Sequence, residues 1–135
     1  MYLLDTDIVS NLMRRAPSLA LVGRLAALRS GERFTSSITI GELVYGAFRV
    51  TERATSIMRR LEEVLFPLGR VLPFDGPAAR RYGELRAELE RRGTPIGEAD
   101  TRIAAIALAH GLTVVTGNVR HFARVPGLVV ENWLA

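Results

Sequence analysis

The sequence predicts an α/β fold with a central, mostly parallel sheet of about five strands. Short apolar runs of three or four residues, typical of strands buried on both faces, recur along the chain. Longer segments with apolar residues at helical spacing separate these runs. Strands that alternate with helices favour a parallel sheet covered by helices. A length of 135 residues suffices for one core, so we expect a single domain over residues 1–135.

The first half of the chain contains two of the expected strands and four helices. The strands are expected at residues 1–4 and 33–36, and the helices at residues 8–12, 17–29, 39–48 and 51–66. The first strand is an apolar run, and a Ser-Ser pair closes the second. Pro17 suits the first position of a helix, because its fixed backbone angle is already helical. Apolar residues between Ile57 and Leu65 recur at helical spacing.

The second half contains the remaining strands and two long helices. The strands are expected at residues 70–72, 112–115 and 128–130, and the helices at residues 77–92 and 98–110. Pro73, Gly93 and Gly111 end the elements that precede them. The helix at 98–110 has an alanine-rich body, which allows close approach to a sheet.

The composition limits the partners and the compartment. All 18 basic residues are arginine, and the net charge is +4. Arginine suits phosphate recognition, although a bias in codon usage explains the same count, so the charge only permits a nucleic-acid partner. The chain has no cysteine, which excludes disulfides and thiolate metal sites. No uncharged run approaches the roughly 18 residues that span a bilayer, so we expect a cytoplasmic protein that contacts no membrane.

Polar side chains follow several of the predicted strands. Asp5 comes directly after the first strand and Glu42 shortly after the second. Asp100 lies at the start of the helix that leads into the fourth strand, and Asn118 lies three residues beyond the end of that strand. Because the carboxyl ends of parallel strands share one edge of a sheet, we expect these four side chains to converge there.

Each of these residues also has a purely structural explanation. Asp5 or Asp7 suits the N-cap of the first helix, and Asp100 suits the positive end of a helix dipole. Thr39 and Glu42 fit a capping box, in which the glutamate bonds back to the helix start. Asn118 suits a turn.

A cluster of carboxylates, however, needs a positive partner. Two like charges about 4 Å apart repel by about 4 kcal/mol at an effective dielectric constant near 20. The chain has no lysine, and few arginines lie near the motifs. A Mg²⁺ or Mn²⁺ ion is the simplest counter-charge, because these ions prefer carboxylate oxygens. Without histidine or cysteine ligands, zinc is disfavoured.

Four motifs resemble those of PIN-domain ribonucleases, specifically the VapC-type toxins of bacterial toxin–antitoxin pairs. They are LLDTDIVS, SITIGELVYG, GTPIGEADTRIAAIALAHGLTVVTGNVRHF and RVPGLVVENW, and together they cover nearly the whole chain in order and spacing. The resemblance implies a three-layer α/β/α fold. It also implies an endoribonuclease that depends on Mg²⁺ or Mn²⁺ and whose acids match Asp5, Glu42 and Asp100. These three residues are therefore the expected metal ligands.

The fourth position of the family motif is commonly aspartate, and here it is Asn118. An amide oxygen can still hold an ion or its water, so we expect weaker binding of a second ion rather than lost activity. Asp7 and Glu98 stand beside motif positions and are candidates to compensate for the missing charge. Thr6 and Thr116 are candidates to orient the ligands. The candidates to contact the RNA backbone are Arg120, His121 and Arg124, and His121 is also a candidate general base.

The resemblance further implies a cognate VapB-type antitoxin, which covers the acidic cleft and commonly inserts an arginine into it, and a homodimer. The apolar faces around Ile8, Leu12, Val44 and Phe48 are candidates for these contacts, with core packing as the alternative use.

Other functional interpretations fit the sequence less well. Asp-Thr-Asp after a strand also resembles the motif of haloacid-dehalogenase-type phosphatases, but those enzymes and receiver domains use a lysine that this chain lacks. A dinucleotide-binding module would need a glycine-rich turn at that place. The remaining alternative is an inactive PIN domain that binds RNA or a protein without cutting, and Asn118 is the feature that favours it.

Overall fold

The computed structural model describes residues 1–134 and contains one sheet of five strands. The strands are β1 (Tyr2–Leu4), β2 (Arg33–Ser36), β3 (Arg70–Leu72), β4 (Thr113–Val115) and β5 (Val130–Glu131). They are all parallel and lie in the order β3-β2-β1-β4-β5. In register, Leu3 of β1 lies between Phe34 of β2 and Val114 of β4. The predicted parallel sheet is confirmed.

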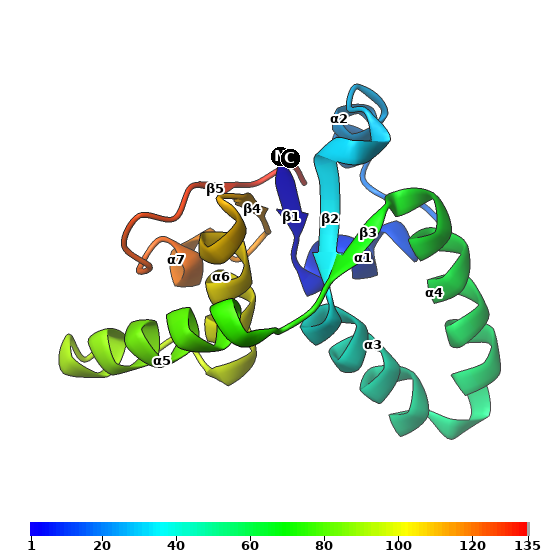
Figure 1. Ribbon diagram of the computed structural model, residues 1–135. Helices are drawn as coiled ribbons and strands as arrows, with labels where there is room; N and C mark the ends of the chain where they lie inside the picture. Colours follow the sequence, from blue (N-terminus) through cyan, green and yellow to red (C-terminus); the bar gives the residue numbers. More distant parts are fainter. Residues whose placement is uncertain (135) are drawn as a thin grey trace.

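Helices connect the strands and cover both faces of the sheet (Figure 1). The α-helices are α1 (Thr6–Leu12), α2 (Leu19–Ala26), α3 (Ser37–Arg49), α4 (Ala54–Leu68), α5 (Gly76–Arg91), α6 (Glu98–His110) and α7 (Val119–Phe122). Two 3₁₀ turns, Ser30–Glu32 and Thr51–Arg53, precede β2 and α4. Figure 1 shows α3 and α4 extending beyond the edge where β1 and β2 end.

The core has two halves, one on each face of the sheet, because successive strand residues point to opposite faces. Leu3 and Val114 pack against apolar residues of α5, α6 and α7. Leu4 and Val115 pack against α1, α2 and α4. The alanine-rich body of α6, with Ala104 fully buried, lies close to the sheet as expected. This arrangement confirms the predicted three-layer α/β/α fold.

Element boundaries differ from the predicted ones mainly at helix starts. The helix expected from residue 8 begins at Thr6, because Asp5 is its N-cap. The helix expected from Pro17 begins at Leu19, because the Ser18 hydroxyl caps it by accepting from the backbone N–H of Leu21 at 3.3 Å. The short helix α7 was not predicted at all, since four residues carry no readable period.

Of the apolar residues expected to serve either partner contacts or the core, most belong to the core. Ile8 is fully buried, and Leu12 and Val44 pack against the cluster on the α1 side. Phe48, near the end of α3, is 59% exposed and is the exception. No helix within residues 1–134 is both long and apolar enough to cross a membrane.

Candidate active site

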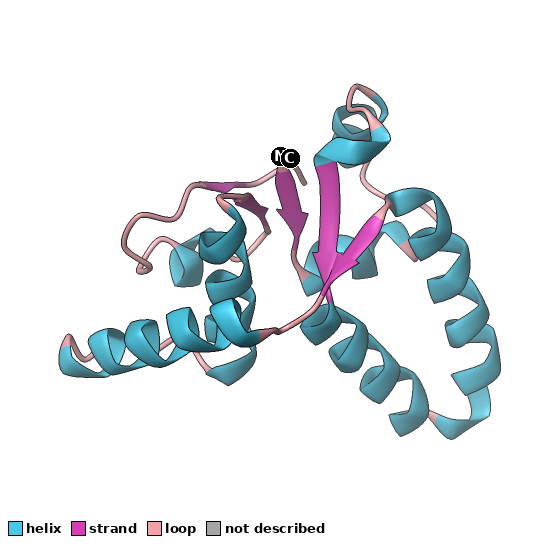
Figure 2. Cartoon of the chain, viewed as in Figure 1, coloured by secondary structure: helices cyan, strands magenta, loops and turns pink. Residues whose placement is uncertain are grey.

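The candidate site lies at the edge where the parallel strands end. The arrowheads of β1, β2 and β3 point to this edge in Figure 2. Asp5 follows β1, Ser36 at the end of β2 caps α3, and Thr116 to Asn118 follow β4. The topology thus places the three connections side by side, because β1 pairs with both β2 and β4.

Asp5 is the buried centre of the site, with an exposure of 4%. Its Oδ1 atom accepts a hydrogen bond from the backbone N–H of Thr6 at 2.7 Å, and Oδ2 accepts one from the Thr116 hydroxyl at 2.8 Å. The expected capping role is therefore real, but it occupies only one of the two oxygens. Burial, together with the negative charges of Asp7 and Asp100, raises the pKa of the Asp5 carboxyl to about 7, although the hydrogen bonds from Thr116 and Thr6 act to lower it.

Glu42 is linked to Asp5 through Thr6, whose backbone N–H contacts Asp5 and whose hydroxyl contacts Glu42. The Thr6 hydroxyl donates to Oε1 of Glu42 at 2.6 Å and lies 3.1 Å from the Thr39 hydroxyl. The capping-box explanation of Glu42 is wrong, because the Ser36 side chain caps α3 by accepting from the Thr39 backbone N–H at 3.1 Å. The Glu42 carboxylate therefore faces α1 and the site.

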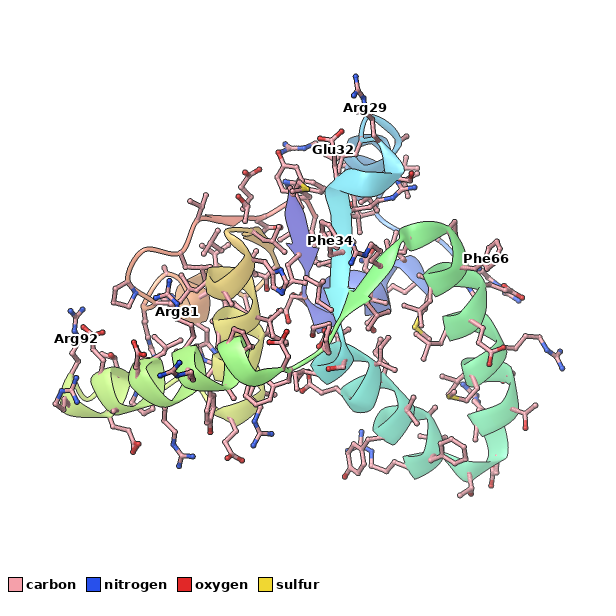
Figure 3. All side chains as sticks on the ribbon, in the orientation of Figure 1. Arg29, Glu32, Phe34, Phe66, Arg81 and Arg92 are labelled. Carbon is pink, nitrogen blue, oxygen red and sulfur yellow. The ribbon has the colours of Figure 1, made fainter. Side chains whose placement is uncertain are left out.

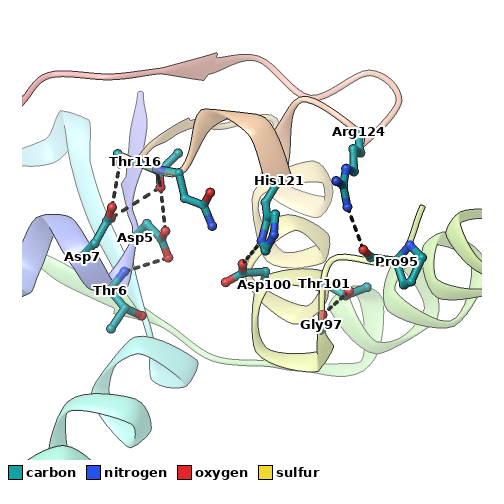
Figure 4. Close-up of polar contacts among 12 residues, drawn as sticks. Asp5, Thr6, Asp7, Pro95, Gly97, Asp100, Thr101, Thr116, His121 and Arg124 are labelled. Carbon is teal, nitrogen blue, oxygen red and sulfur yellow. Dashed lines mark hydrogen bonds and ion pairs between the residues drawn. The ribbon is translucent and has the colours of Figure 1, made fainter.

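Asp100 approaches Asp5 from the first turn of α6. Figure 4 shows its carboxylate beside that of Asp5, and its charge contributes to the raised pKa of Asp5. Oδ2 of Asp100 lies 3.1 Å from Nδ1 of His121, which comes from α7. Local periodicity in the sequence could not predict this contact, because the two residues are 21 positions apart. His121, the candidate for RNA contact or general base, thus contacts an expected metal ligand.

Asp7 clamps the loop after β4. Its Oδ2 atom accepts a hydrogen bond from the backbone N–H of Gly117 at 2.8 Å, and Oδ1 lies 3.4 Å from the Thr116 hydroxyl. The Asn118 backbone N–H donates to the Thr116 hydroxyl oxygen at 2.9 Å. The Asn118 side chain makes no capping hydrogen bond to α7, although its backbone occupies the N-cap position. Asp7 thus holds the segment that carries Asn118.

Gly117 allows this close contact. A Cβ atom at this position would lie 2.7 Å from Oδ2 of Asp7 and 2.8 Å from Cδ1 of Leu134. We therefore expect Gly117→Ala to displace the clamp and to lower the free energy of unfolding by about 1–3 kcal/mol. Gly83→Ala is the matched control, because it lies within α5 with open space around it and should stabilise by about 0.5–1 kcal/mol. Urea unfolding measures the stability of both variants. Equal stability would contradict the close contact between Gly117 and Asp7.

Glu98 and Arg124 contact groups other than Asp5, Glu42 and Asp100. Glu98 is held by guanidinium groups of Arg86 and Arg102, each at 3.4 Å, and its side chain is 60% exposed. Arg124, which follows α7, donates to the carbonyl oxygen of Pro95 at 3.0 Å and so connects the segment after α7 to the loop before α6 (Figure 4). Arg120 is exposed. Of these, Glu98 has the contacts of a surface ion pair rather than those of a metal ligand.

The donor set fits a hard divalent cation. No arginine within residues 1–134 forms an ion pair with Asp5, Glu42 or Asp100. In the same part of the chain, no three acidic, histidine or cysteine side chains converge as a ready-made metal site. Mg²⁺ needs less, because one or two carboxylates hold it and a phosphate substrate and water supply the other oxygens. Asp5 and Asp100 are the candidates for such a pair, and Glu42 is linked to Asp5 through Thr6.

Comparison with known proteins agrees with this geometry. The model of the PIN domain family matches residues 2–128. The chain belongs to the PIN-domain family. Within it, the chain is similar to the VapC-type proteins: a Salmonella typhimurium protein named tRNA(fMet)-specific endonuclease VapC is 44% identical over 78% of this chain and 79% of its own. A Shigella flexneri protein of the same name is 39% identical over 98% of this chain and 97% of its own.

Solved structures of PIN-domain toxins have the same fold. VapBC2 from Rickettsia felis, bound to a DNA fragment from its promoter, contains a chain that matches with a TM-score of 0.86 and 32% identity. The match covers 98% of this PIN domain and 98% of that chain. The fold of this chain is therefore that of these PIN-domain proteins.

Proposed function

We propose that this PIN domain is a metal-dependent endoribonuclease that acts as the toxin of a toxin–antitoxin pair. The observation that carries the proposal is the buried carboxylate of Asp5 beside that of Asp100 at the end of β1, with a pKa raised to about 7. A buried anion that is disfavoured by its own surroundings is a site prepared for a cation. The names of the relatives, endonuclease and ribonuclease, support the same chemistry.

The residues of the site have different roles in the proposed hydrolysis of an RNA phosphodiester. Asp5 and Asp100 would hold Mg²⁺ or Mn²⁺, with Glu42 directly or through water. When bound, the ion would neutralise the phosphate and lower the pKa of the attacking water. Because water rather than the ribose 2′-hydroxyl attacks, the expected products carry 5′-phosphate and 3′-hydroxyl ends.

Neighbouring side chains hold these carboxylates in place. Thr116 fixes one oxygen of Asp5, the Thr6 hydroxyl holds Glu42, and His121 contacts Asp100. Asn118, carried by the loop that Asp7 clamps, would add an amide oxygen for a water or a second ion. These assignments give Asp7 a positioning role rather than a direct place among the metal ligands.

Partners follow from the family. Structures of a toxin–antitoxin complex from Klebsiella pneumoniae and of a member of the VapBC family of toxin–antitoxin systems from Mycobacterium tuberculosis contain a chain of this fold. We therefore propose a VapB-type antitoxin as partner, and we propose a homodimer as the assembly of this chain. Two of the relatives are named for cleavage of tRNA(fMet), which makes transfer RNA the first substrate to test.

An RNA cleavage assay tests the proposal. The purified protein should cut transfer RNA with Mg²⁺ and should lose that activity with a chelator. Asp100→Asn keeps the size of the side chain but removes a charge that the ion needs, so its cleavage should fall by about 100-fold or more. If the wild type and Asp100→Asn cut equally, the activity is a contaminant. If the wild type binds RNA and never cuts it, the inactive binding module is the correct function.

A further inference from the structure

A basic hollow lies at the C-terminal end of α1, the helix that begins beside Asp5, and has no role in the function proposed above. It measures about 570 Å³ and lies between the end of α1 and the N-terminal part of α4. We call it the arginine hollow, and the residues that line it are Ser10, Met13, Arg14, Arg15, Arg53, Ser56, Ile57 and Arg60. Four of these eight residues are arginines, and none is acidic.

One arginine fixes the wall of the hollow and the other three remain available. Arg60 donates to the carbonyl oxygens of Leu12 and Met13, at 3.0 and 3.3 Å, and pairs with Glu63. It therefore joins α4 to the end of α1. Arg14, Arg15 and Arg53 are exposed, and within residues 1–134 they form no ion pair. Like charges gathered without a counter-ion attract an anion.

The hollow continues the catalytic edge along one face of α1. This helix buries Ile8 and Val9, which leaves the opposite face to solvent. Thr6, whose hydroxyl holds Glu42, shares that face with Ser10, which lines the hollow, because positions four apart in a helix lie one above the other. At about 1.5 Å per residue, Ser10 lies about 6 Å along the helix axis from Thr6, and Arg14 follows shortly after the end of α1 at Leu12. A strand of a few nucleotides spans this distance.

We propose that the arginine hollow binds the sugar-phosphate backbone of single-stranded RNA on one side of the bond that is cut. This inference rests on the proposed function and adds to it the direction in which the substrate runs, from the acidic edge along α1 towards α4. Guanidinium groups bind phosphate oxygens through two parallel N–H donors, and the hydroxyls of Ser10 and Ser56 add donors beside them. Contacts of this kind fix position without reading sequence.

Binding without cleavage tests the inference. The background is Asp100→Asn in the presence of a chelator, and the probe is a fluorescent single-stranded RNA titrated at several salt concentrations. Each phosphate contact contributes about −0.7 to the slope of log K against log salt for single strands. Arg14→Gln combined with Arg53→Gln should therefore make the slope shallower by about 1.4.

The matched control removes the same charge elsewhere. Arg80 and Arg81 are exposed residues of α5, which packs on the opposite face of the sheet, and Arg81 is labelled in Figure 3. Arg80→Gln combined with Arg81→Gln should leave the slope unchanged. An equal effect of both double variants would overturn the inference, since only net charge would then matter. An unchanged slope in the Arg14 and Arg53 variant, with loss of binding to poly-glutamate instead, would assign the hollow to an acidic protein.

These outcomes are separate from those of the proposed function. A wild type that cuts RNA while its hollow variant retains the full salt slope contradicts only the path of the substrate. A protein that binds RNA through the hollow without any Mg²⁺-dependent cleavage contradicts only the nuclease.

Discussion

Replacing Asp5 by asparagine is expected to abolish RNA cleavage and, at the same time, to stabilise the metal-free protein above pH 7. Cleavage should fall by about 100-fold or more, because the variant loses an anionic oxygen at the centre of the proposed ion site. Stability should rise because the carboxylate of Asp5 is 4% exposed and repelled by Asp7 and Asp100, whereas a neutral amide of the same size is not. Because Asp5→Asn should remain folded, its loss of cleavage would not be due to unfolding.

The pH dependence of this gain follows from the direction of the pKa shift. The carboxyl of Asp5 has a pKa of about 7 in the folded protein, against an ordinary value of 3.8. Between these values the folded state holds a proton that the unfolded state has released, so the stability of the wild type falls as the pH rises from about 4 to about 7. Asp5→Asn lacks this loss, and the gap between the two proteins should grow to a few kcal/mol, with about 4 as its limit, by pH 8.

Urea unfolding of both proteins in chelator, at two pH values, measures this difference in stability. The two pH values, about 4.5 and about 8, lie near the two limits of that window. Asp5→Ala is the control for the N-cap, because asparagine still accepts the Thr6 N–H bond while alanine loses it at a cost of about 1 kcal/mol. Mg²⁺ should stabilise the wild type at the higher pH and leave Asp5→Asn unchanged. If Asp5→Asn is the less stable protein at both pH values, the carboxylate is not strained in the way described.

The sheet and its edge could be predicted from the sequence because short local signals mark where the strands and helices end. The runs at 33–36 and 70–72 coincide with β2 and β3, and the helix at 98–110 coincides with α6, because Ser-Ser, Pro73 and Gly111 mark their ends. Once strands alternate with helices, their carboxyl ends must share an edge. The convergence of Asp5 with Asp100 then follows from chain order alone.

The contacts within the site could not be predicted in the same way. The bond between Thr6 and Glu42 joins residues 36 positions apart, and the bond between Gly117 and Asp7 joins residues 110 positions apart. Their partners depend on side-chain rotamers and on loop paths that no periodicity encodes. Glu98 shows the reverse error, since proximity to Asp100 in the sequence suggested a shared site, whereas the first turn of α6 directs it to Arg86 and Arg102.

Thr116→Val is expected to weaken both the fold and the activity, because this hydroxyl connects three parts of the site. It donates to Oδ2 of Asp5 at 2.8 Å and accepts from the Asn118 backbone N–H at 2.9 Å, in a position with no exposed surface. Valine fills the same space but leaves both groups without a partner. A buried polar group left unpaired costs about 1–3 kcal/mol, and a charged one costs more.

The loss of stability in Thr116→Val should be larger at pH values where Asp5 is charged. The Thr116 hydrogen bond lowers the pKa of the Asp5 carboxyl, so removing it raises that pKa further and makes the charged form harder to keep. We therefore expect a larger loss of stability at about pH 8, where Asp5 is mostly charged, than at about pH 5, where it is mostly protonated. RNA cleavage should fall by about 10- to 100-fold. Thr116→Ser keeps the hydroxyl and loses only a methyl group, so it should recover most of the activity and the ordinary pH profile. Valine and serine variants with the same cleavage rate would show that Thr116 fills space and does not position Asp5.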